Sequence, residues 1–483
     1  MHIKRYMKRL RLLNLILSVL ILWSCTDDWN FSTDSRYKLG FSADTVSMDT
    51  VFSGVASSSA KFMIYNSNDV GLRFDAVMGG GAGSPFRMNV DGEGGTSVLG
   101  LEIPAGDSLF CYISVNMPES QSTELFNAFD SIRFILESGN VQFVRLSAHG
   151  QNAVRLRGLT IVSDTVLSAR LPFIIFDSLS VAADATLTLS PGTRLYFHSG
   201  AVLDVAGKLI AQGTPDSMIL MRGDRLDVML TEPPVSYDLL AAQWGGIRFR
   251  SGSYDNVLSY CDIHGGTFGI KADSASADKV KFNMYSSIVH NVEGNGIEVT
   301  GCCIDVANSQ ITNAGASCLD IAGGKSDFTF CTIADFSLWS VGKQAVVIRD
   351  SRDNVNVPFA GAQFRNCIIT GRHANEVVVE LPDSIKQTDS YSFDYSLVMT
   401  TDSLDFHYHY VKFDHHKTKG GGAANFINNS IDGFKSVFRL DSLSRARGIA
   451  DSLSQVWPLD IAGVERPVKG ADAGCYQYVP IPK

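Results

Sequence analysis

Four cysteines lie close together in the sequence, and thiols at this density could bind zinc, form disulfides or make a redox centre. They are Cys302, Cys303, Cys318 and Cys331. Each of these sites requires the four side chains to converge in space. The choice among them therefore depends on the elements that carry the cysteines.

A second candidate is the segment DFHYHYVKFDHH at residues 405–416. Histidines that alternate along a strand point to one face, and imidazole and carboxylate groups at such spacing can bind zinc or copper. The candidate metal ligands are His407, His409, Asp414, His415 and His416. The interleaved aromatic residues Phe406, Tyr408 and Tyr410 could stack on sugar rings, or they could cover the flank of a larger fold. An exposed segment that binds nothing is the alternative.

The elements that carry these residues are repeats. Six segments follow one template of an apolar residue, any residue, Tyr/Asn/Phe, Cys/Ser, any residue and Ile/Val, and only Asn283 breaks its first position. The segments are LSYCDI (258–263), NMYSSI (283–288), VANSQI (306–311), FTFCTI (328–333), FRNCII (364–369) and FDYSLV (393–398). A shorter run such as GIKA or GIEV lies between consecutive segments. A unit of 22 to 25 residues with several short strands, lengthened only by insertions, predicts coils of a right-handed parallel β-helix.

The chain before the repeats predicts export and a separate domain. Basic residues precede an apolar run from Leu12 to Leu22 that is short for a membrane span, so residues 1–25 are predicted to be a signal peptide. Residues 26–37 are polar and are predicted to be a tether. Residues 38–155 contain short alternating runs that predict an antiparallel β-sandwich.

The end of the signal peptide, LWSC, resembles the lipobox of bacterial lipoproteins, although Trp23 departs from its usual small or aliphatic residue. The resemblance implies that Cys25 becomes the first mature residue and carries the acyl chains of a membrane anchor. The following TDDW resembles the signal that sends lipoproteins of the Bacteroidota type to the outer face of the outer membrane. A periplasm-facing anchor and an ordinary secretory signal are the alternatives.

Two further resemblances concern the domains. FSADTVSMDTVFSG, SPFRMNVDG and IPAGDSLFCYISV resemble an immunoglobulin-like domain of Bacteroidota lipoproteins. WGGIRF (244–249) with NVLSYCDIHGG resembles the pectate-lyase-like β-helix superfamily, and LDIAGVERPVKGADAGCYQY resembles the ending of many exported β-helices, with Cys475 and Gln477 in place of Ala and Glu. We therefore expect an all-β chain, with a β-helix at 158–440, an insertion at about 400–425, and a tail at 441–483 that caps the open carboxyl end.

The superfamily resemblance implies that any working groups lie outward on one sheet, and the shorter runs give such a row: Lys271, Glu298, Asp320, Val347 and Val378. Glu298 and Asp320 would lie on adjacent coils, where like charges repel. The pair could hold a cation such as calcium or serve as the two carboxylates of a glycosidase. A solvated face in which Lys271 offsets one charge is the interpretation that we favour. No arginine or lysine base is expected beside these acids, as β-helix lyases need. No grouping like the Asp-Asp/His of polygalacturonases is expected either, and we predict that His264 and His290 are turn residues.

The template also bears on the cysteines. It places Cys331 in one stacked position with Cys261, Ser286, Ser309, Cys367 and Ser396. Serine at equal positions indicates a need for a small residue, which a four-ligand zinc site does not tolerate. Cys331 and Cys367 alone share this position on consecutive coils, so a disulfide between them is not forbidden. We predict free, buried thiols.

Composition narrows the function. The chain has 483 residues, a net charge of −9 and a pI near 5.6, which argues against nucleic acid as a partner. We predict a lipid-anchored envelope protein whose β-helix is a binding or structural module, with a glycan or another envelope protein as partner and with no cofactor, or else calcium or zinc. A polysaccharide lyase or glycoside hydrolase is one alternative, and a scaffold without a small ligand is the other.

Overall fold

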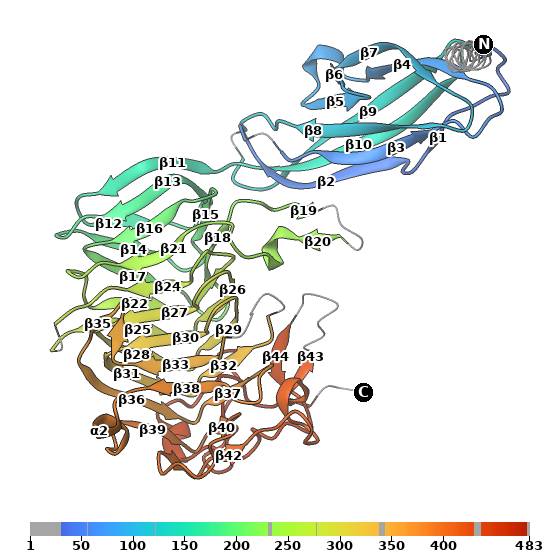
Figure 1. The fold of residues 1–483 in the computed structure, drawn as a ribbon. Helices are drawn as coiled ribbons and strands as arrows, with labels where there is room; N and C mark the ends of the chain where they lie inside the picture. Colours follow the sequence, from blue (N-terminus) through green and yellow to red (C-terminus); the bar gives the residue numbers. More distant parts are fainter. Residues whose placement is uncertain are drawn as a thin grey trace, which may run out of the picture. The chain divides into compact units, whose positions relative to one another are not determined.

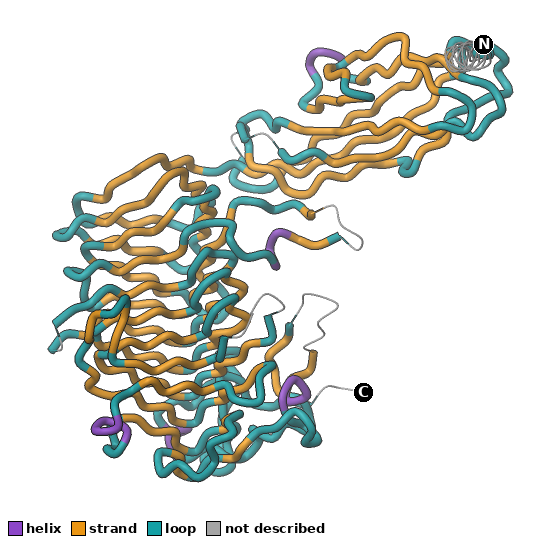
Figure 2. The backbone as a smooth tube through the Cα atoms, in the orientation of Figure 1, coloured by secondary structure: helices purple, strands orange, loops and turns teal. Residues whose placement is uncertain are grey.

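The computed structural model describes residues 30–55, 57–120, 122–229, 234–276, 278–337, 343–428 and 436–480. The predicted signal peptide and Cys25 lie outside these residues. The chain divides into two compact units, Met1–Gln151 and Asn152–Lys483, and strands dominate both (Figures 1 and 2). Among the described residues, no helix has the length and apolar character needed to cross a membrane.

The first unit is a β-sandwich of two five-stranded sheets. One sheet has the order β1 (Gly40–Phe41), β3 (Ala60–Tyr65), β8 (Ser108–Val115), β5 (Phe86–Val90), β6 (Glu93–Gly95). The other has the order β2 (Thr45–Phe52), β10 (Val141–Gln151), β9 (Phe126–Leu136), β4 (Leu72–Met78), β7 (Ser97–Ile103). Alternate residues of β4 are buried, as expected for a strand with one face on the core. Strands β2 and β10 pair in parallel, which departs from the predicted antiparallel arrangement.

The described end of the predicted tether is part of the sandwich. Phe31 forms a β-bridge with Gly71, and the amide nitrogen of Ser32 donates to the Gly71 carbonyl at 3.0 Å. The side chain of Asn140 donates to the carbonyl of Ser35 at 2.6 Å. The tether prediction is therefore wrong for residues 30–37, because main-chain hydrogen bonds leave no sign in side-chain periodicity.

The second unit is a parallel β-helix whose coils are built from three strand series. The first face contains β15 (Arg194–Phe197), β18 (Ile219–Gly223), β23 (Cys261–His264), β26 (Ile288–Val292), β29 (Gln310–Ala314), β32 (Thr332–Asp335), β37 (Ile368–Gly371), β40 (Leu397–Val398) and β42 (Lys412–Phe413). The second face contains β16 (Val202–Val205), β21 (Gly246–Phe249), β24 (Ile270–Ala272), β27 (Ile297–Thr300), β30 (Leu319–Ala322), β33 (Val346–Arg349) and β38 (Val377–Glu380).

The third face contains β12 (Thr165–Leu167), β14 (Thr186–Leu189), β17 (Lys208–Gln212), β22 (Asn256–Ser259), β25 (Val280–Tyr285), β28 (Cys303–Ala307), β31 (Gly324–Thr329), β36 (Phe359–Arg365), β39 (Tyr391–Asp394) and β41 (Tyr408–His409). At the amino end, β13 (Phe173–Val181) runs along the first and second faces and pairs with β11 (Val154–Ile161).

Hairpins and short helical turns leave the coils between these strands. The short elements are β19 (Val228–Met229), β20 (Val235–Ser236), η2 (Tyr237–Leu239), β34 (Ser351–Arg352), β35 (Val355–Asn356), α2 (Asp383–Lys386), η3 (Gly422–Asn425), β43 (Phe426–Asn428), β44 (Val437–Leu440) and η5 (Ser452–Gln455). The sandwich adds η1 (Gly81–Gly83).

Inward side chains of equal register form continuous stacks along the solenoid. On the third face, Phe328, Phe364, Phe393 and Tyr408 stack on one another with ring centroids 4.8, 4.9 and 5.0 Å apart. Offset-stacked aromatic pairs of this kind each contribute roughly 0.5–1.5 kcal/mol beyond the burial of their surface. On the first face, Ile263, Val289, Ile311 and Ile333 fill the same interior.

One left-handed residue makes the corner between the third and first faces. Tyr260 is the single residue between β22 and β23, and its φ of 49° lets the chain turn sharply. The equivalent residues in the next coils are Ser286, Asn308, Phe330, Asn366 and Tyr395, all with positive φ. Asparagine tolerates this conformation better than most residues.

The observed register corrects the predicted alignment in one coil. Ser259 pairs with Tyr285 and Asp262 pairs with Ile288, so the second segment is MYSSIV (284–289) and is shifted by one residue from the prediction. Ser287 therefore occupies the cysteine position, and the misfit at Asn283 disappears. The consecutive serines in YSS allow either register in the sequence.

The cysteines are buried thiols, and none of those in the described residues forms a disulfide. Cys302, Cys318 and Cys331 are fully buried, and Cys303 is partly exposed. Burial raises the pKa of the Cys261 thiol to about 12. In the equivalent serine positions the hydroxyl accepts a backbone hydrogen bond: Ser287 Oγ accepts from the amide of Cys261 at 3.0 Å. The described thiols thus act as small core residues.

The chain after β40 also differs from the prediction. The segment predicted to be an insertion at about 400–425 contains β41 and β42, which pair with β39 and β40 and continue the coils. The tail beyond residue 441 lies along the flank of the first face: Cys475 N donates to Thr332 Oγ1 at 3.1 Å, and Gly474 N donates to the Asn366 carbonyl at 2.8 Å. The tail is a lateral cover over several coils, because its hydrogen-bonding groups match the outward polar groups of that face.

Candidate functional site

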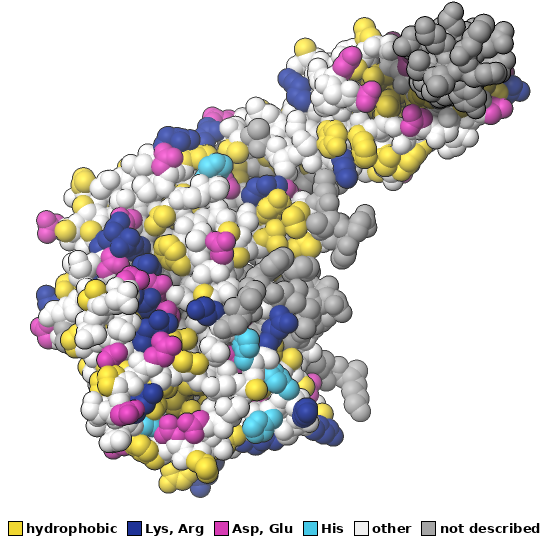
Figure 3. All heavy atoms as spheres, viewed as in Figure 1, with side chains coloured by type: hydrophobic (Ala, Val, Ile, Leu, Met, Phe, Trp, Pro, Cys, Tyr) yellow, Lys and Arg dark blue, Asp and Glu magenta, His cyan; other side chains and the backbone are white. Residues whose placement is uncertain are grey.

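The outward row of the second face brings the two predicted carboxylates together. Lys271 is in register with Glu298, and Glu298 with Asp320. Lys271 Nζ lies 2.9 Å from Glu298 Oε1, so Lys271 offsets one charge as expected, but the row is not a solvated face, because the Glu298 and Asp320 side chains are only 13% and 9% exposed. Figure 3 shows basic and acidic side chains interspersed over this part of the solenoid.

Two arginines complete this row, and the sequence analysis did not anticipate them. Arg352, at the end of β34, donates from Nη2 to Asp320 Oδ1 at 3.0 Å and from Nη1 to Asp320 Oδ2 at 3.3 Å. The same Nη1 lies 3.4 Å from Glu298 Oε1. Arg349 Nε lies 3.2 Å from Asp320 Oδ1. The expectation that no arginine stands beside the acids is wrong, because the β34–β35 hairpin folds Arg352 back over the row and Arg349 ends the strand β33 beside it.

The charged side chains of this row are better suited to stabilising the fold than to acid–base catalysis. Burial alone would raise the pKa of Glu298, but the hydrogen bond from Lys271 and the charge of Arg352 lower it below its usual value. A carboxylate held ionised by cations cannot donate a proton at neutral pH. The basic side chains also neutralise the two carboxylates, so little negative potential remains to attract a metal cation.

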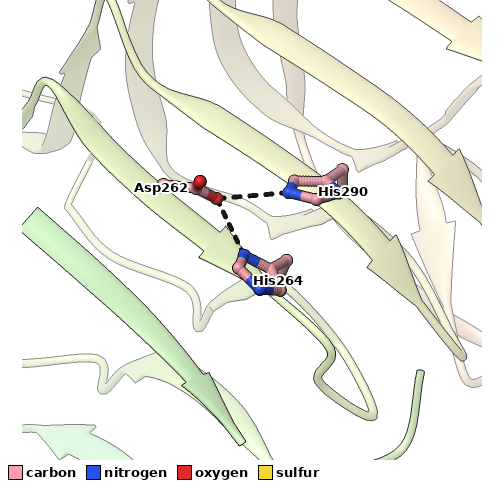
Figure 4. A group of neighbouring side chains, drawn as sticks. All are labelled: Asp262, His264 and His290. Carbon is pink, nitrogen blue, oxygen red and sulfur yellow. Dashed lines mark hydrogen bonds and ion pairs between the residues drawn. The ribbon is translucent and has the colours of Figure 1, made fainter. Parts of the chain in front are cut away.

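A different cluster lies on the outer face of β23 and β26, at the end of these strands (Figure 4). Asp262 and His264 point outward from β23, and His290 is in register with His264 on β26. Asp262 Oδ1 lies 2.9 Å from His264 Nδ1 and 3.2 Å from His290 Nε2. The prediction that His264 and His290 are turn residues is wrong, since both belong to strands.

Two more charged residues lie on the other side of His264: Asp238 contacts its ring, and Arg222 pairs with Asp238. His264 Nε2 lies 3.1 Å from Asp238 Oδ1, and Arg222 forms an ion pair with the same carboxylate. Burial would lower the pKa of His264, yet Asp262 and Asp238 together raise it to about 9. The hydrogen bond from His264 lowers the pKa of Asp238 to about 2. Both ring nitrogens of His264 thus have a carboxylate partner, Asp262 at Nδ1 and Asp238 at Nε2.

A cleft lined by both polar and apolar residues opens beside this cluster. Its volume is about 370 Å³, and it lies between the first face and β44, with Leu239 and Tyr476 also in its lining. Its polar and aromatic lining includes His290, Gln310, Thr312, Asn313, Arg439 and Tyr476. Gln310 Nε2 donates to Thr312 Oγ1 at 2.9 Å, and the Tyr476 hydroxyl donates to Gln310 Oε1 at 3.1 Å. The side chains of the cleft are thus oriented by one another before any ligand arrives.

The histidine-rich segment at 405–416 does not form the predicted metal site. His407 is buried, and its two ring nitrogens contact Asp405 and the carbonyl of Thr388. Asp414 is buried and accepts hydrogen bonds from Thr370, Gly422 and Asn425. The remaining candidates point elsewhere: His409 contacts Asp394, His416 contacts the His373 carbonyl, and His415 is exposed. The structure does not bring the five side chains together.

The aromatic candidates of the same segment have different positions. Tyr408 is the last ring of the third-face stack. Tyr410 stacks on Tyr395 at 4.7 Å and Phe406 stacks on His407 at 4.0 Å, with 76% and 52% of their surfaces exposed. They mainly continue the rows of the solenoid.

Sequence reasoning missed the cluster around His264, although a signal was present. Asp262 and His264 alternate on one strand, and the correct register places His290 beside His264. With the alignment shifted by one residue, His290 falls out of that row. Asp238 comes from a loop, and no periodicity predicts its position.

Comparisons with known proteins give structural likenesses only. No family model matches the chain, and no curated protein matches it. Among solved structures, the chain is similar to the pectate lyase Pel9A (TM-score 0.30, 10% identity, 68% of this chain and 88% of that chain). It is also similar to the catalytic unit of a GH87 alpha-1,3-glucanase from Streptomyces thermodiastaticus strain HF3-3 (TM-score 0.24, 10% identity, 74% of this chain and 78% of that chain).

A third match is to a family 123 glycoside hydrolase from Clostridium perfringens (TM-score 0.18, 10% identity, 25% of this chain and 30% of that chain), so the chain spans less than a third of that enzyme. At TM-scores this low, none of the three matches carries an argument about activity. The assignment of the β-helix rests on the strand pairing described above.

Proposed function

We propose that the solenoid is a glycan-binding module of the cell envelope and that the cleft beside β26 and β29 is its binding site. The lining of that cleft supports the proposal. Amide, hydroxyl and imidazole groups offer both donors and acceptors, which sugar hydroxyls require, and Tyr476 adds an aromatic surface. The larger cavity beneath the β34–β35 hairpin, about 520 Å³, is lined largely by apolar residues such as Val357 and Phe359 and suits a sugar less well.

Retention of the purified protein on immobilised polysaccharides, uronate-containing and neutral, tests this proposal. Gln310→Ala removes the side chain that links Thr312 and Tyr476, and we expect it to abolish retention. Lys271→Met, on the second face, is the matched control and should bind like the wild type. Loss of binding in Lys271→Met alone would move the site to the second face, and no retention of the wild type on any polysaccharide would favour a scaffold.

A polysaccharide lyase or glycoside hydrolase is the second candidate. The observation in its favour is that His290, which lines the cleft, has a carboxylate partner in Asp262, the arrangement of a general base with its orienting acid. New reducing ends or an unsaturated product, formed by the wild type and absent in His290→Gln, would establish this activity. Binding without turnover would exclude it for the polysaccharides tested.

We also propose that a lipid on Cys25 anchors the protein to the outer membrane with the solenoid exposed at the surface. The support is the basic region, the apolar run and the LWSC ending, followed by TDDW. Mass spectrometry of the mature amino terminus should find an acylated Cys25, and Cys25→Ser should release the protein from the membrane fraction. Protease treatment of intact cells distinguishes the surface-exposed protein, which is cleaved, from a periplasm-facing one.

A further inference from the structure

Three side chains on the outer face of β23 and β26 offer one ligand atom each to a common point. Within the residues that the structure describes, Asp262, His264 and His290 are the only group of three or more histidine, cysteine or acidic side chains whose ligand atoms all lie within 4.8 Å of one another. The two imidazole nitrogens converge on one carboxylate oxygen (Figure 4). Two imidazoles and one carboxylate are a ligand set of zinc and of other first-row transition metals.

The surroundings of His264 match what a metal ligand needs. Its other ring nitrogen, Nε2, lies 3.1 Å from Asp238 Oδ1 and can donate to it. A carboxylate behind a ligating histidine fixes the ring and its tautomer, so that the lone pair of the opposite nitrogen faces the metal. Arg222 pairs with Asp238 and holds it in place. The His264 side chain is only 5% exposed, so its orientation is set by packing as well.

The position of the group also favours a bound ion. Strands β23 and β26 are neighbours in a parallel sheet, and Asp262 and His264 are two residues apart on one of them. The backbone of two coils therefore fixes all three ligands. His290 lines the cleft between the first face and β44, which places the group at the edge of that cleft and gives an ion a route in from solvent.

We propose that Asp262, His264 and His290 bind one divalent transition-metal ion, with zinc as the best match, and that Asp238 orients His264 for this role. Two nitrogen ligands disfavour calcium, which prefers oxygen ligands. The inference does not depend on glycan binding, and it assigns the metal to residues outside the histidine-rich segment at 405–416.

Calorimetric titration of the chelator-treated full chain with zinc, without any sugar, tests the proposal. We expect one ion per chain, loss of that ion in His290→Gln, and about 10- to 100-fold weaker binding in Asp238→Asn, which keeps all three ligands. The matched control is His409→Gln, because His409 also pairs with an aspartate, Asp394, at 2.8 Å but belongs to no group of three converging ligand atoms among the described residues. It should bind zinc like the wild type.

Cobalt substitution gives an independent readout, since its visible spectrum reports the number and type of ligands. A spectrum that is present in the wild type and in His409→Gln but absent in His290→Gln supports the site. The proposal is overturned if the wild type takes up no zinc, if His290→Gln binds like the wild type, or if His409→Gln alone loses the ion. Should His290→Gln not fold, unchanged zinc affinity in Asp238→Asn overturns it. Polysaccharide retention is measured separately, so either proposal can fail without the other.

Discussion

Arg352 is the residue whose removal should most affect the charged row of the second face. It donates two hydrogen bonds to the Asp320 carboxylate and one to the Asp320 carbonyl, and it lies 3.4 Å from Glu298. The side chains of Arg352, Asp320 and Glu298 are 16%, 9% and 13% exposed, so solvent screens these contacts only in part. Breaking a buried ion pair by removing one partner costs about 3–5 kcal/mol. Asp320 keeps Arg349 and Glu298 keeps Lys271, so we expect Arg352→Met to cost about 2 kcal/mol.

Urea unfolding followed by tryptophan fluorescence measures this cost, because Trp244 is buried in the solenoid. Methionine retains much of the apolar stem of Arg352, so the change removes its charge together with its hydrogen bonds, including those to the carbonyls of Val299 and Asp320. Arg349→Met is the matched control: Arg349 is 29% exposed, and we expect it to cost about 1 kcal/mol or less. In Arg352→Met the pKa of Glu298 should also rise, since a cation that lowers it is gone.

A double-mutant cycle with Glu298→Gln separates the pair from the rest of the row. We expect a coupling energy of about 1 kcal/mol between positions 298 and 352, within the range for residues in one ionic network. If Arg352→Met costs no more than Arg349→Met and the coupling is near zero, the reasoning is refuted. The second face would then be an ordinary solvated surface.

Three further predictions concern buried groups of the solenoid. Burial raises the pKa of Glu376 to about 8 against the hydrogen bonds that it accepts from His373 and Ala345, so the folded state holds a proton that the unfolded state loses. Stability relative to Glu376→Gln should therefore fall from about pH 4.3 to pH 8, by up to about 1.4 kcal/mol per pH unit, and a flat difference in urea midpoints would contradict this. Ser287→Ala removes the acceptor for the Cys261 amide and should cost about 1–3 kcal/mol in thermal or urea unfolding. Ser287→Cys, which places there the residue found in other coils, should cost less, and equal costs would argue against the hydrogen bond. Unreduced protein unfolded in denaturant should titrate eight thiols besides Cys25, whereas six would indicate a disulfide.

The repeat predicts the architecture well because a solenoid is encoded locally. Each coil needs an aliphatic residue, a small residue and a corner residue at fixed spacing, so six segments sufficed to identify the fold. The same local pattern could not fix the register where two serines follow Tyr285. That one-residue ambiguity concealed the alignment of His264 with His290.

The parts that the sequence did not predict come from loops and from the tail. Arg352 reaches the acidic row because the β34–β35 hairpin turns back after β33, whereas Arg349 reaches it from the end of β33. Asp238 reaches His264 from a turn between β20 and β21. Such contacts depend on chain direction in three dimensions, and side-chain periodicity carries no information about them.

The lateral tail has a consequence for the order in which the chain folds. Each coil of a solenoid contacts only its neighbours. Without a further connection, the terminal coil can therefore unfold while the remaining coils stay folded. Here Arg466 donates to Asn308 at 2.7 Å, Cys475 to Thr332, and Gly474 to Asn366, so a single late segment joins several coils. It can dock only after those coils have wound, and once docked it makes them open together. Docking of this segment would thus convert a stepwise stack into one cooperative unit.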